Sequence, residues 1–186
     1  MIQYSPLTDS IKAAIEERLG PEALSNSPEK LAEYAGDSSE LNFTPELVVH
    51  CRNSGDIQAL LELANRYRFP VTPRGGGSGL AGGCLPSLGG VVLATEKLNR
   101  IEYIDERNFI MKADAGVISQ HVREAADRAG LFYPPDPAGM DLSTIGGNAA
   151  TDAGGPACVK YGTTRDYILG LEAVLASGQL ITTGVR

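Results

Sequence analysis

The stretch VTPRGGGSGLAGG, residues 71–83, places six glycines in thirteen positions directly after a short apolar run. Glycine has no Cβ, so it allows positive φ and lets successive backbone N–H groups converge on an anion. Ser78 can add a hydroxyl donor, and Arg74 is placed either to pair with a phosphate or to anchor the loop. The stretch therefore predicts a loop whose own amides bind a diphosphate. The alternative is a flexible surface turn without a ligand.

A P-loop is a competing phosphate-binding motif with the pattern G-x-x-x-x-G-K-[ST]. Gly77 and Gly82 have the required spacing. However, Gly83 stands in place of the lysine, and Cys84 stands in place of the hydroxyl residue. The sequence therefore excludes a P-loop.

The dinucleotide-binding fingerprint G-x-G-x-x-G is matched literally by Gly77, Gly79 and Gly82. The match follows an expected strand, and Glu96 stands near the place of a ribose-binding acid. However, this fingerprint works only where its glycines lead into a helix whose N-terminus holds the pyrophosphate. Residues 84–90, CLPSLGG, leave no room for such a helix before the strand expected from Val91. The match is therefore coincidental.

A second glycine-rich stretch, STIGGNAATDAGGPACVKYG, occupies residues 143–162. Its small residues keep side chains away from a flat ligand, namely Gly146, Gly147, Ala149 and Ala150. Ser143 and Thr144 can supply hydrogen bonds, and Asn148 is suited to bracing a tight turn. Two separate glycine-rich surfaces indicate one long ligand between them. A dinucleotide is such a ligand, with one loop for its pyrophosphate and another wall for its rings.

The amino-terminal part is expected to be helical. Two hydroxyl–proline pairs, Ser5-Pro6 and Ser27-Pro28, predict helix starts, and the two helices are expected to end near Gly20 and Gly36. Segment 37–46, DSSELNFTPE, is polar and is interpreted as a surface loop.

Strands are expected on either side of the first glycine-rich stretch. The apolar run at residues 47–51 and the segments 70–73 and 91–95 predict three strands. Residues 54–67 have the apolar spacing of an amphipathic helix. Strand, helix and strand in this order are typical of a small parallel sheet.

The rest of the chain is expected to be mainly antiparallel. Residues 101–104 and 109–113 predict one strand pair, and residues 169–176 with 180–183 predict a hairpin. Residues 117–129 predict an amphipathic helix with His121 on its inner face. Segment 131–165 is long and irregular and contains apolar residues, so we expect it to be packed and to face a ligand.

Composition excludes several classes of protein. A length of 186 residues suits one domain, or one domain with a small appendage, and a net charge of −7 argues against nucleic acid as a general partner. No apolar run approaches the ~20 residues of a membrane span, and the amino terminus has no signal-peptide features. Three separated cysteines and two histidines predict neither a disulfide framework nor a metal site, and they fit a cytoplasmic protein.

Three motifs in order, PRGGGSGLAGG, PPDPAG and STIGGNAATDAGG…KYG, resemble the amino-terminal FAD-binding domain of FAD-linked oxidases. This is the PCMH-type flavin fold of the vanillyl-alcohol oxidase family. The likeness is greatest to the branch of D-lactate dehydrogenase, the glycolate oxidase large subunit and D-2-hydroxyglutarate dehydrogenase, and it covers roughly residues 45–186.

The resemblance implies an α+β fold. An amino-terminal helical segment, residues 1–45, would precede a FAD-binding domain, residues 46–186. That domain would consist of a small parallel α/β lobe, residues 46 to about 100, and an incomplete antiparallel sheet lobe from about residue 101 onward.

The resemblance also implies which residues bind FAD. The diphosphate would lie on the first stretch, with contacts from Pro73, Arg74, Gly75, Gly76, Gly77, Ser78, Gly79, Leu80, Gly82 and Gly83. The flavin side would be lined by Pro137, Ser143, Thr144, Ile145, Gly146, Gly147, Asn148 and Ala150. The wall near the isoalloxazine ring would be completed by Gly154, Gly155, Tyr161 and Gly162. Arg74 and Asn148 could equally be structural, and Tyr161 is more often a packing residue than a catalyst.

The implied activity is oxidation of a 2-hydroxy acid, such as glycolate or D-lactate, by hydride transfer to flavin N5. Relatives with covalent flavin carry a histidine beside the glycine loop, whereas Ser78 stands here, so non-covalent FAD is expected. In the family, a stretch that contacts adenine and a separate substrate-binding domain follow the hairpin. The sequence ends at Arg186, so the chain is expected to be truncated and inactive alone. No catalytic base is identified, because His50 and His121 both lie on expected core elements.

A second hypothesis is a non-catalytic FAD-binding module that needs another chain or a missing carboxyl-terminal half. For the full-length enzyme, the expected partners are a small 2-hydroxy acid and an electron-transfer partner. The last expected strand leaves an open sheet edge, which favours pairing with another copy of the chain.

Overall fold

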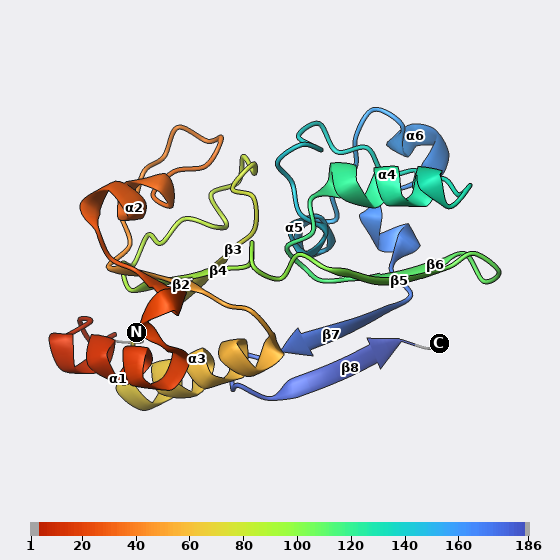
Figure 1. Ribbon diagram of the computed structural model, residues 1–186. Coiled ribbons are helices and arrows are strands. Elements are labelled where there is room, and N and C mark those ends of the chain that lie inside the picture. The colour runs from red at the N-terminus through yellow and green to blue at the C-terminus, as the bar shows by residue number, and fades with distance from the viewer. Residues whose placement is uncertain (1–3, 185–186) are drawn as a thin grey trace. The chain divides into compact units, whose positions relative to one another are not determined.

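The computed structural model describes residues 4–184 (Figure 1). By their internal contacts these residues form two units. The first unit contains the chain up to Lys97 together with the part from Gly170 onward, and the second unit is Leu98–Leu169.

A four-stranded sheet is the centre of the first unit, in the order β1-β2-β4-β3. Its strands are β1 (Leu24–Ser25), β2 (Leu47–His50), β3 (Val71–Arg74) and β4 (Val91–Ala94). Both β2 and β3 run parallel to β4, which confirms the parallel sheet that the apolar runs predicted. The short strand β1 pairs antiparallel with β2 and was not predicted.

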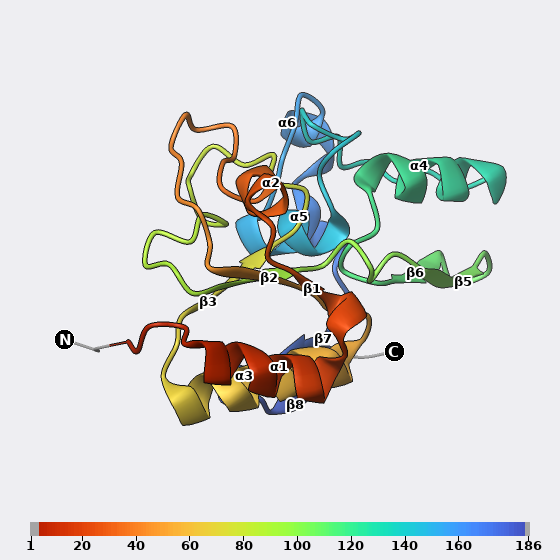
Figure 2. The same ribbon diagram turned by 60° about the vertical axis from the view of Figure 1, so that its left-hand side comes forward.

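Helices cover both faces of this sheet (Figures 1 and 2). On one face, α1 (Asp9–Leu19) and α3 (Ser54–Tyr67) pack against each other and against the strands. On the other face, α2 (Pro28–Glu33) packs Leu31 and the following Tyr34 against the strands. A short 3-10 helix, Pro21–Ala23, follows α1, and its Ala23 belongs to the core under α1 and α3.

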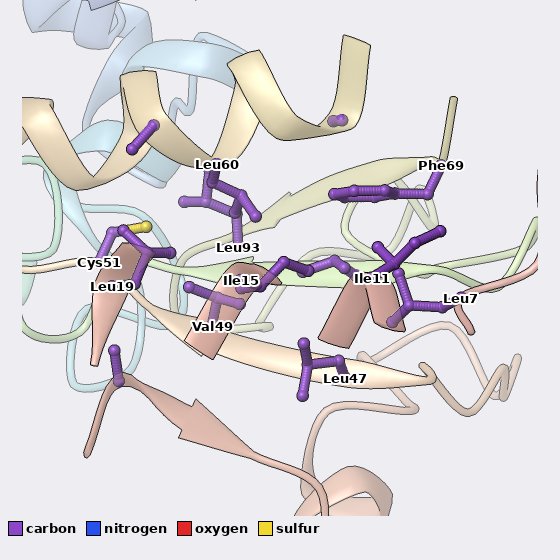
Figure 3. Packing of buried hydrophobic residues seen from close by; sticks show 14 residues of the cluster. Leu7, Ile11, Ile15, Leu19, Leu47, Val49, Cys51, Leu60, Phe69 and Leu93 are labelled. Carbon is purple, nitrogen blue, oxygen red and sulfur yellow. The ribbon is translucent and has the colours of Figure 1, made fainter. Parts of the chain in front are cut away.

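The hydrophobic core follows from the alternation of side chains along β2. Leu47 and Val49 point toward α1 and α3, where they meet Ile15 and Leu60 (Figure 3). Val48, between them, belongs to the smaller cluster under α2, because successive strand residues face opposite sides of a sheet. A continuous apolar run is therefore what a strand buried on both faces requires.

Replacing Leu60 by alanine is expected to lower the free energy of unfolding by about 2–5 kcal/mol. Leu60 is fully buried in the main core cluster, so the substitution leaves a cavity. Urea denaturation measures the loss. Leu88→Ala is the control, because Leu88 is 69% exposed and its truncation is expected to stay within about 0.5 kcal/mol. Equal losses in the two variants would contradict this description of the core.

The boundaries of the amino-terminal helices differ from the prediction. Helix α1 begins at Asp9 and is capped by Thr8, whose hydroxyl accepts a hydrogen bond from the Ile11 N–H, and Ser5 is not the cap. The Ser5 amide instead donates to the carbonyl of Arg68 at 2.8 Å, which holds this part of the chain outside the helix.

Helix α2 begins as predicted, with Ser27 as the cap and Pro28 in the first turn. It ends at Glu33, before the expected end at Gly36. Gly36 instead forms an antiparallel bridge with Asn42, so the chain has already turned.

The second unit begins with the predicted antiparallel pair, β5 (Ile101–Asp105) and β6 (Ile110–Ala113). Helix α4 (Ser119–Arg128) follows, and its buried residues are Ser119, Val122, Ala125 and Ala126. His121 is exposed, so the expectation that it lies on the inner face is wrong. The helix rotates this position outward, while Val122 and Ala126 take the inner face at the i, i+4 spacing.

Segment 131–165 is less irregular than expected. It contains two short helices, α5 (Ile145–Thr151) and α6 (Cys158–Tyr161), and a 3-10 helix, Thr164–Tyr167, begins near its end. Helix α5 forms although its sequence contains two glycines, because the Thr144 hydroxyl accepts a hydrogen bond from the Gly147 N–H and caps the first turn.

The predicted carboxyl-terminal hairpin is present as β7 (Gly170–Val174) and β8 (Leu180–Gly184). Its turn packs on α3, because Gln58 and Asn65 donate side-chain hydrogen bonds to the carbonyls of Gly178 and Ala176 at 3.0 and 2.7 Å. No helix within residues 4–184 has both the length and the apolar character needed to cross a membrane.

Candidate functional site

The first glycine-rich stretch leaves the sheet at the carboxyl end of β3. Arg74, the last residue of β3, pairs in register with Ala94 of β4, which pairs with His50 of β2. Residues 75–90 form bends and turns without a helix, which confirms that the dinucleotide fingerprint is coincidental. A loop at this edge of a parallel sheet is in the position where α/β proteins commonly bind ligands.

The backbone of this loop carries unpaired donors. Within residues 4–184, no acceptor is found for the backbone N–H groups of residues 75–81. The loop turns at Gly77, whose φ is +68°, a conformation that favours glycine. A run of amides without protein acceptors fits a ligand with several closely spaced anionic oxygens, as a diphosphate has.

The side chain of Arg74 packs against this loop. It is buried, with Nη1 3.5 Å from the Cys84 sulfur and the guanidinium 5.6 Å from the centre of the Tyr34 ring. A Cβ built on Gly77 would lie 2.2 Å from Arg74 Nη2, so the loop packs directly on the guanidinium. Of the two roles that the sequence left open for Arg74, this geometry supports anchoring.

The far part of the loop is open. A Cβ built on Gly79 or Gly83 would meet no atom within 4 Å, so neither glycine is required by packing inside the chain. Leu80 is 77% exposed, and Gly82 has a φ of +71°. The bare main chain at Gly79 and Gly83 is therefore accessible to a ligand.

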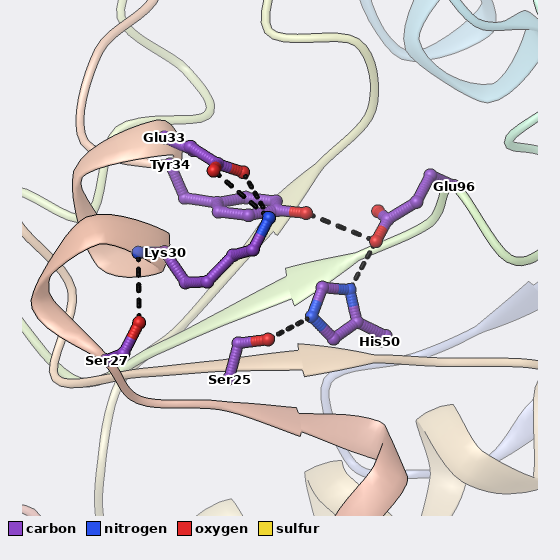
Figure 4. Close-up of polar contacts among 7 residues, drawn as sticks. All are labelled: Ser25, Ser27, Lys30, Glu33, Tyr34, His50 and Glu96. Carbon is purple, nitrogen blue, oxygen red and sulfur yellow. Dashed lines mark hydrogen bonds and ion pairs between the residues drawn. The ribbon is translucent and has the colours of Figure 1, made fainter.

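A polar network lies beside this loop on the α2 face of the sheet (Figure 4). His50 Nε2 is 2.8 Å from the Ser25 hydroxyl, and His50 Nδ1 contacts Glu96 Oε1. The Tyr34 hydroxyl donates to the same Glu96 oxygen at 3.2 Å. Both ring nitrogens of His50 are therefore occupied, which agrees with the interpretation of His50 as a structural residue.

The pKa values in this network follow from burial and hydrogen bonding. Burial, reinforced by the charge of Glu96, raises the pKa of Tyr34 to about 12, so its hydroxyl stays protonated. Burial also acts to raise the pKa of Glu96, but hydrogen bonds from His50, from the backbone and from Tyr34 outweigh it and hold the pKa below its usual value. Glu96 is therefore ionised near neutral pH. Together these side chains line a cleft of about 330 Å³.

Sequence reasoning missed this network. Glu96 was considered only as a ribose ligand of the rejected fingerprint, and Tyr34 was not singled out. The positions of His50 and Glu96 could have indicated it. His50 is the last residue of β2, Glu96 closely follows β4, and these two strands are parallel neighbours. Once that strand order is known, a histidine and a carboxylate are expected at the same edge.

In the second unit, the predicted Ser143 and Asn148 form a buried polar cluster with Ser119, which was not predicted. Ser143 Oγ lies 2.8 Å from Ser119 Oγ, and the Asn148 amide donates to Ser119 Oγ at 2.7 Å. All three residues are buried, and Thr144 caps α5. Of the two roles considered for Asn148, these contacts support a structural one.

The glycines of the second stretch are set mainly by close packing. A Cβ on Gly146 would lie 2.6 Å from the Ala115 Cβ, and one on Gly162 would lie 2.2 Å from an Asp166 carboxylate oxygen. Tyr161 lies edge-on to Phe132 with ring centres 5.7 Å apart. Tyr161 is nevertheless 37% exposed, so part of its ring stays accessible.

The predicted cofactor residues thus divide between the two units. The group Pro73–Gly83 belongs to the first unit, and the group from Pro137 to Gly162 belongs to the second. Within the second group, Ile145 and Gly147 are partly buried, whereas Ala150 is exposed. That both groups contact one FAD stays a prediction.

The fold and the loop define a class of protein. The parallel strands β2, β4 and β3 are followed by a glycine loop with unpaired amides and without a helix, which distinguishes this domain from the Rossmann fold. The crystal structure of p-cresol methylhydroxylase with substrate bound shares this fold, with a TM-score of 0.80 at 20% identity. The match covers 99% of this chain and 37% of that chain.

Comparison of sequences then gives the family. The chain belongs to the FAD binding domain family, whose match spans residues 45–184. It is 40% identical over 179 residues to glycolate oxidase subunit GlcD of Bacillus subtilis (strain 168), covering 96% of this chain and 38% of that protein. It is 46% identical over 138 residues to D-lactate dehydrogenase of Archaeoglobus fulgidus, covering 74% of this chain and 31% of that protein. FAD is therefore the cofactor, and the unpaired amides of residues 75–81 fit its diphosphate.

Proposed function

We propose that this chain is the FAD-binding part of an oxidoreductase that oxidises a small 2-hydroxy acid, such as glycolate or D-lactate. The similarity to glycolate oxidase subunit GlcD and to D-lactate dehydrogenase supports this substrate class. Bound FAD supplies the redox chemistry by accepting a hydride at N5. The chain spans 38% and 31% of the lengths of these two relatives, so the activity is proposed for a protein that also contains a substrate-binding part.

The diphosphate site is proposed on the first glycine-rich stretch. The amides of residues 75–81 would donate to the phosphate oxygens, and Arg74 would hold the loop in shape while its charge attracts the anion. Ser78 stands beside Gly77 where covalent relatives carry histidine, so the protein is proposed to hold FAD without a covalent bond. The observation that carries the proposal is this run of amides without acceptors among residues 4–184.

The flavin side is proposed on the second stretch, from Pro137 to Gly162. Its buried Ser143 and Asn148 would fix the backbone, because both side chains hydrogen-bond to the Ser119 hydroxyl of α4. Backbone groups near Gly154 and Gly155 would then face the ligand, since their N–H groups have no acceptor among the described residues.

The proposed setting is the cytoplasm, in line with three free cysteines. An electron-transfer partner is proposed for the whole enzyme. Association between copies is proposed at the β7–β8 hairpin, because its two strands pair only with each other among the described residues and Leu171 and Leu180 are exposed.

A non-catalytic FAD-binding module is the second candidate function. It is favoured by His50, the histidine of the first unit, because both of its ring nitrogens are engaged and neither is free to act as a base. The two candidates differ in turnover of a 2-hydroxy acid, and both require that the chain binds FAD.

Adding FAD to the purified chain is expected to stabilise it. At a free FAD concentration near one hundred times Kd, the stabilisation should be about 2.7 kcal/mol, measured as a rise in the thermal unfolding temperature. ADP is expected to compete, because the loop binds a diphosphate, whereas riboflavin, which has no phosphate, is the control and should compete weakly. If FAD neither stabilises the chain nor copurifies with it, the proposed diphosphate site is wrong.

A further inference from the structure

Asp37 and Ser38 hydrogen-bond to the glycine loop. The sequence predicted a polar surface loop at 37–46, but Asp37 Oδ2 accepts a hydrogen bond from the Gly82 N–H at 3.1 Å. The neighbouring Ser38 N–H donates to the Gly79 carbonyl at 3.0 Å. These contacts span more than forty residues of sequence and fix both ends of the open part of the loop.

The Asp37 carboxylate is itself held in place. Its second oxygen, Oδ1, accepts hydrogen bonds from both the backbone N–H and the hydroxyl of Ser39. The Ser39 hydroxyl, outweighing slight burial, is the main reason that the pKa of Asp37 lies below its usual value, and the Ser39 and Gly82 amides and the charge of Arg74 contribute. Asp37 is therefore ionised at neutral pH, with each oxygen engaged.

A carboxylate at this place is unfavourable for the ligand by charge alone. It stands next to a loop whose free amides fit a diphosphate, and two anions repel each other. The nearby Arg74 offsets part of this repulsion. The contribution of Asp37 must therefore come from geometry. Because its carboxylate accepts a hydrogen bond from the Gly82 N–H, Asp37 fixes the turn at Gly82, where φ is +71°.

We propose that Asp37 is a positioning residue for FAD binding: it fixes the glycine loop at Gly82, with Ser38 at Gly79, so that the amides of residues 75–81 keep the arrangement that receives the diphosphate. The inference rests on the proposed function of this loop. Asp37 does not touch the cofactor in this proposal, and it acts through the backbone of the loop.

For both Asp37→Asn and Asp37→Ala, an electrostatic role of Asp37 and a positioning role predict opposite changes in FAD affinity. Both variants remove a negative charge near the diphosphate, so a purely electrostatic effect would tighten FAD binding. Loss of the fixed turn would weaken it. We expect Kd for FAD, measured by quenching of flavin fluorescence in the purified chain, to rise about tenfold in Asp37→Ala, and less in Asp37→Asn, which keeps one oxygen acceptor.

Two controls separate this role from others. Glu33→Gln removes a negative charge from an exposed position on the preceding helix, where Glu33 forms an ion pair with Lys30. Its Kd should stay within about twofold of wild type. Thermal unfolding of each apoprotein shows whether the variant is still folded at the temperature at which Kd is measured. A lower stability with an unchanged Kd would mean that Asp37 is structural only, which overturns the proposal.

Ser39→Ala keeps the test decisive if Asp37→Ala does not fold. This variant removes the hydroxyl that holds Asp37 Oδ1 but leaves the carboxylate and its bond to Gly82. A rise in Kd of about threefold is expected. An unchanged or lower Kd in both Ser39→Ala and Asp37→Asn would overturn the proposal. Failure of the wild-type chain to bind FAD would instead reject the proposed function of the loop.

Discussion

The Gly79→Val variant is expected to bind FAD about a hundredfold more weakly than wild type while its apoprotein keeps its stability. A Cβ at Gly79 would meet nothing within 4 Å inside the chain, and the φ of Gly79 does not lie in the left-handed region. A valine side chain therefore costs the protein little and occupies the space in front of the free amides. Fluorescence titration with FAD gives Kd, and thermal unfolding of the apoprotein gives the stability.

An alanine series gives the matched control for this prediction. Gly79→Ala should weaken FAD binding by about tenfold. Gly55→Ala should leave Kd unchanged, because Gly55 lies in α3, outside the proposed site, and a Cβ there would meet only the Asn53 side chain, at 3.0 Å. Gly77 is a poor choice for the same test. Its φ of +68° and the Arg74 guanidinium 2.2 Å from an added Cβ would change the loop itself. Unchanged FAD affinity in Gly79→Val would show that the ligand does not lie against Gly79.

The strands and the loop could be predicted because each has a local cause. Short apolar runs predicted β2 and β4, and the segment 70–73 predicted β3. The residues CLPSLGG at 84–90 excluded a helix after the glycines. The strand order could not be predicted in the same way. β4 lies between β2 and β3, and this placement depends on packing against α1 and α3.

The contacts around the loop show the same limit. Asp37 and Gly82 are distant in sequence, and so are Tyr34 and Glu96, yet each pair is hydrogen-bonded. A polar segment such as 37–46 is typical of a surface loop when it is considered alone. Its function becomes visible only when the fold brings it to the glycine loop.

The two glycine-rich stretches look alike in sequence but have different physical causes. In the first, Gly79 and Gly83 have open space where a side chain would be. In the second, Gly146 and Gly155 are required by neighbouring backbone, which a Cβ would overlap. Glycine content predicted a bare main chain in both places. It could not predict that the glycines of the first stretch leave open space beside the main chain, whereas those of the second mostly allow close packing against neighbouring segments.

Gly155→Ala is expected to destabilise the second unit by about 2–5 kcal/mol without any ligand present. A Cβ at Gly155 would lie 2.0 Å from the carbonyl oxygen of Asp136, and its φ of +137° is one that side-chain-bearing residues rarely adopt. The segment has little freedom to move away, because the Asp136 carboxylate also accepts a hydrogen bond from the Ala157 N–H at 3.0 Å. Urea denaturation and amide hydrogen exchange of residues 145–162 measure the effect.

The neighbouring Gly154→Ala is the matched control, because a Cβ there would meet the Cys158 side chain at 3.4 Å, close to ordinary contact, and φ is not in the left-handed region. Its cost should stay below about 1 kcal/mol. Because both measurements use the apoprotein, they report packing and not FAD. Equal stability of the two variants would mean that Asp136 and the 154–157 turn separate easily. The glycine at 155 would then be explained by access for the cofactor, as at Gly79, and not by the approach of two backbone segments.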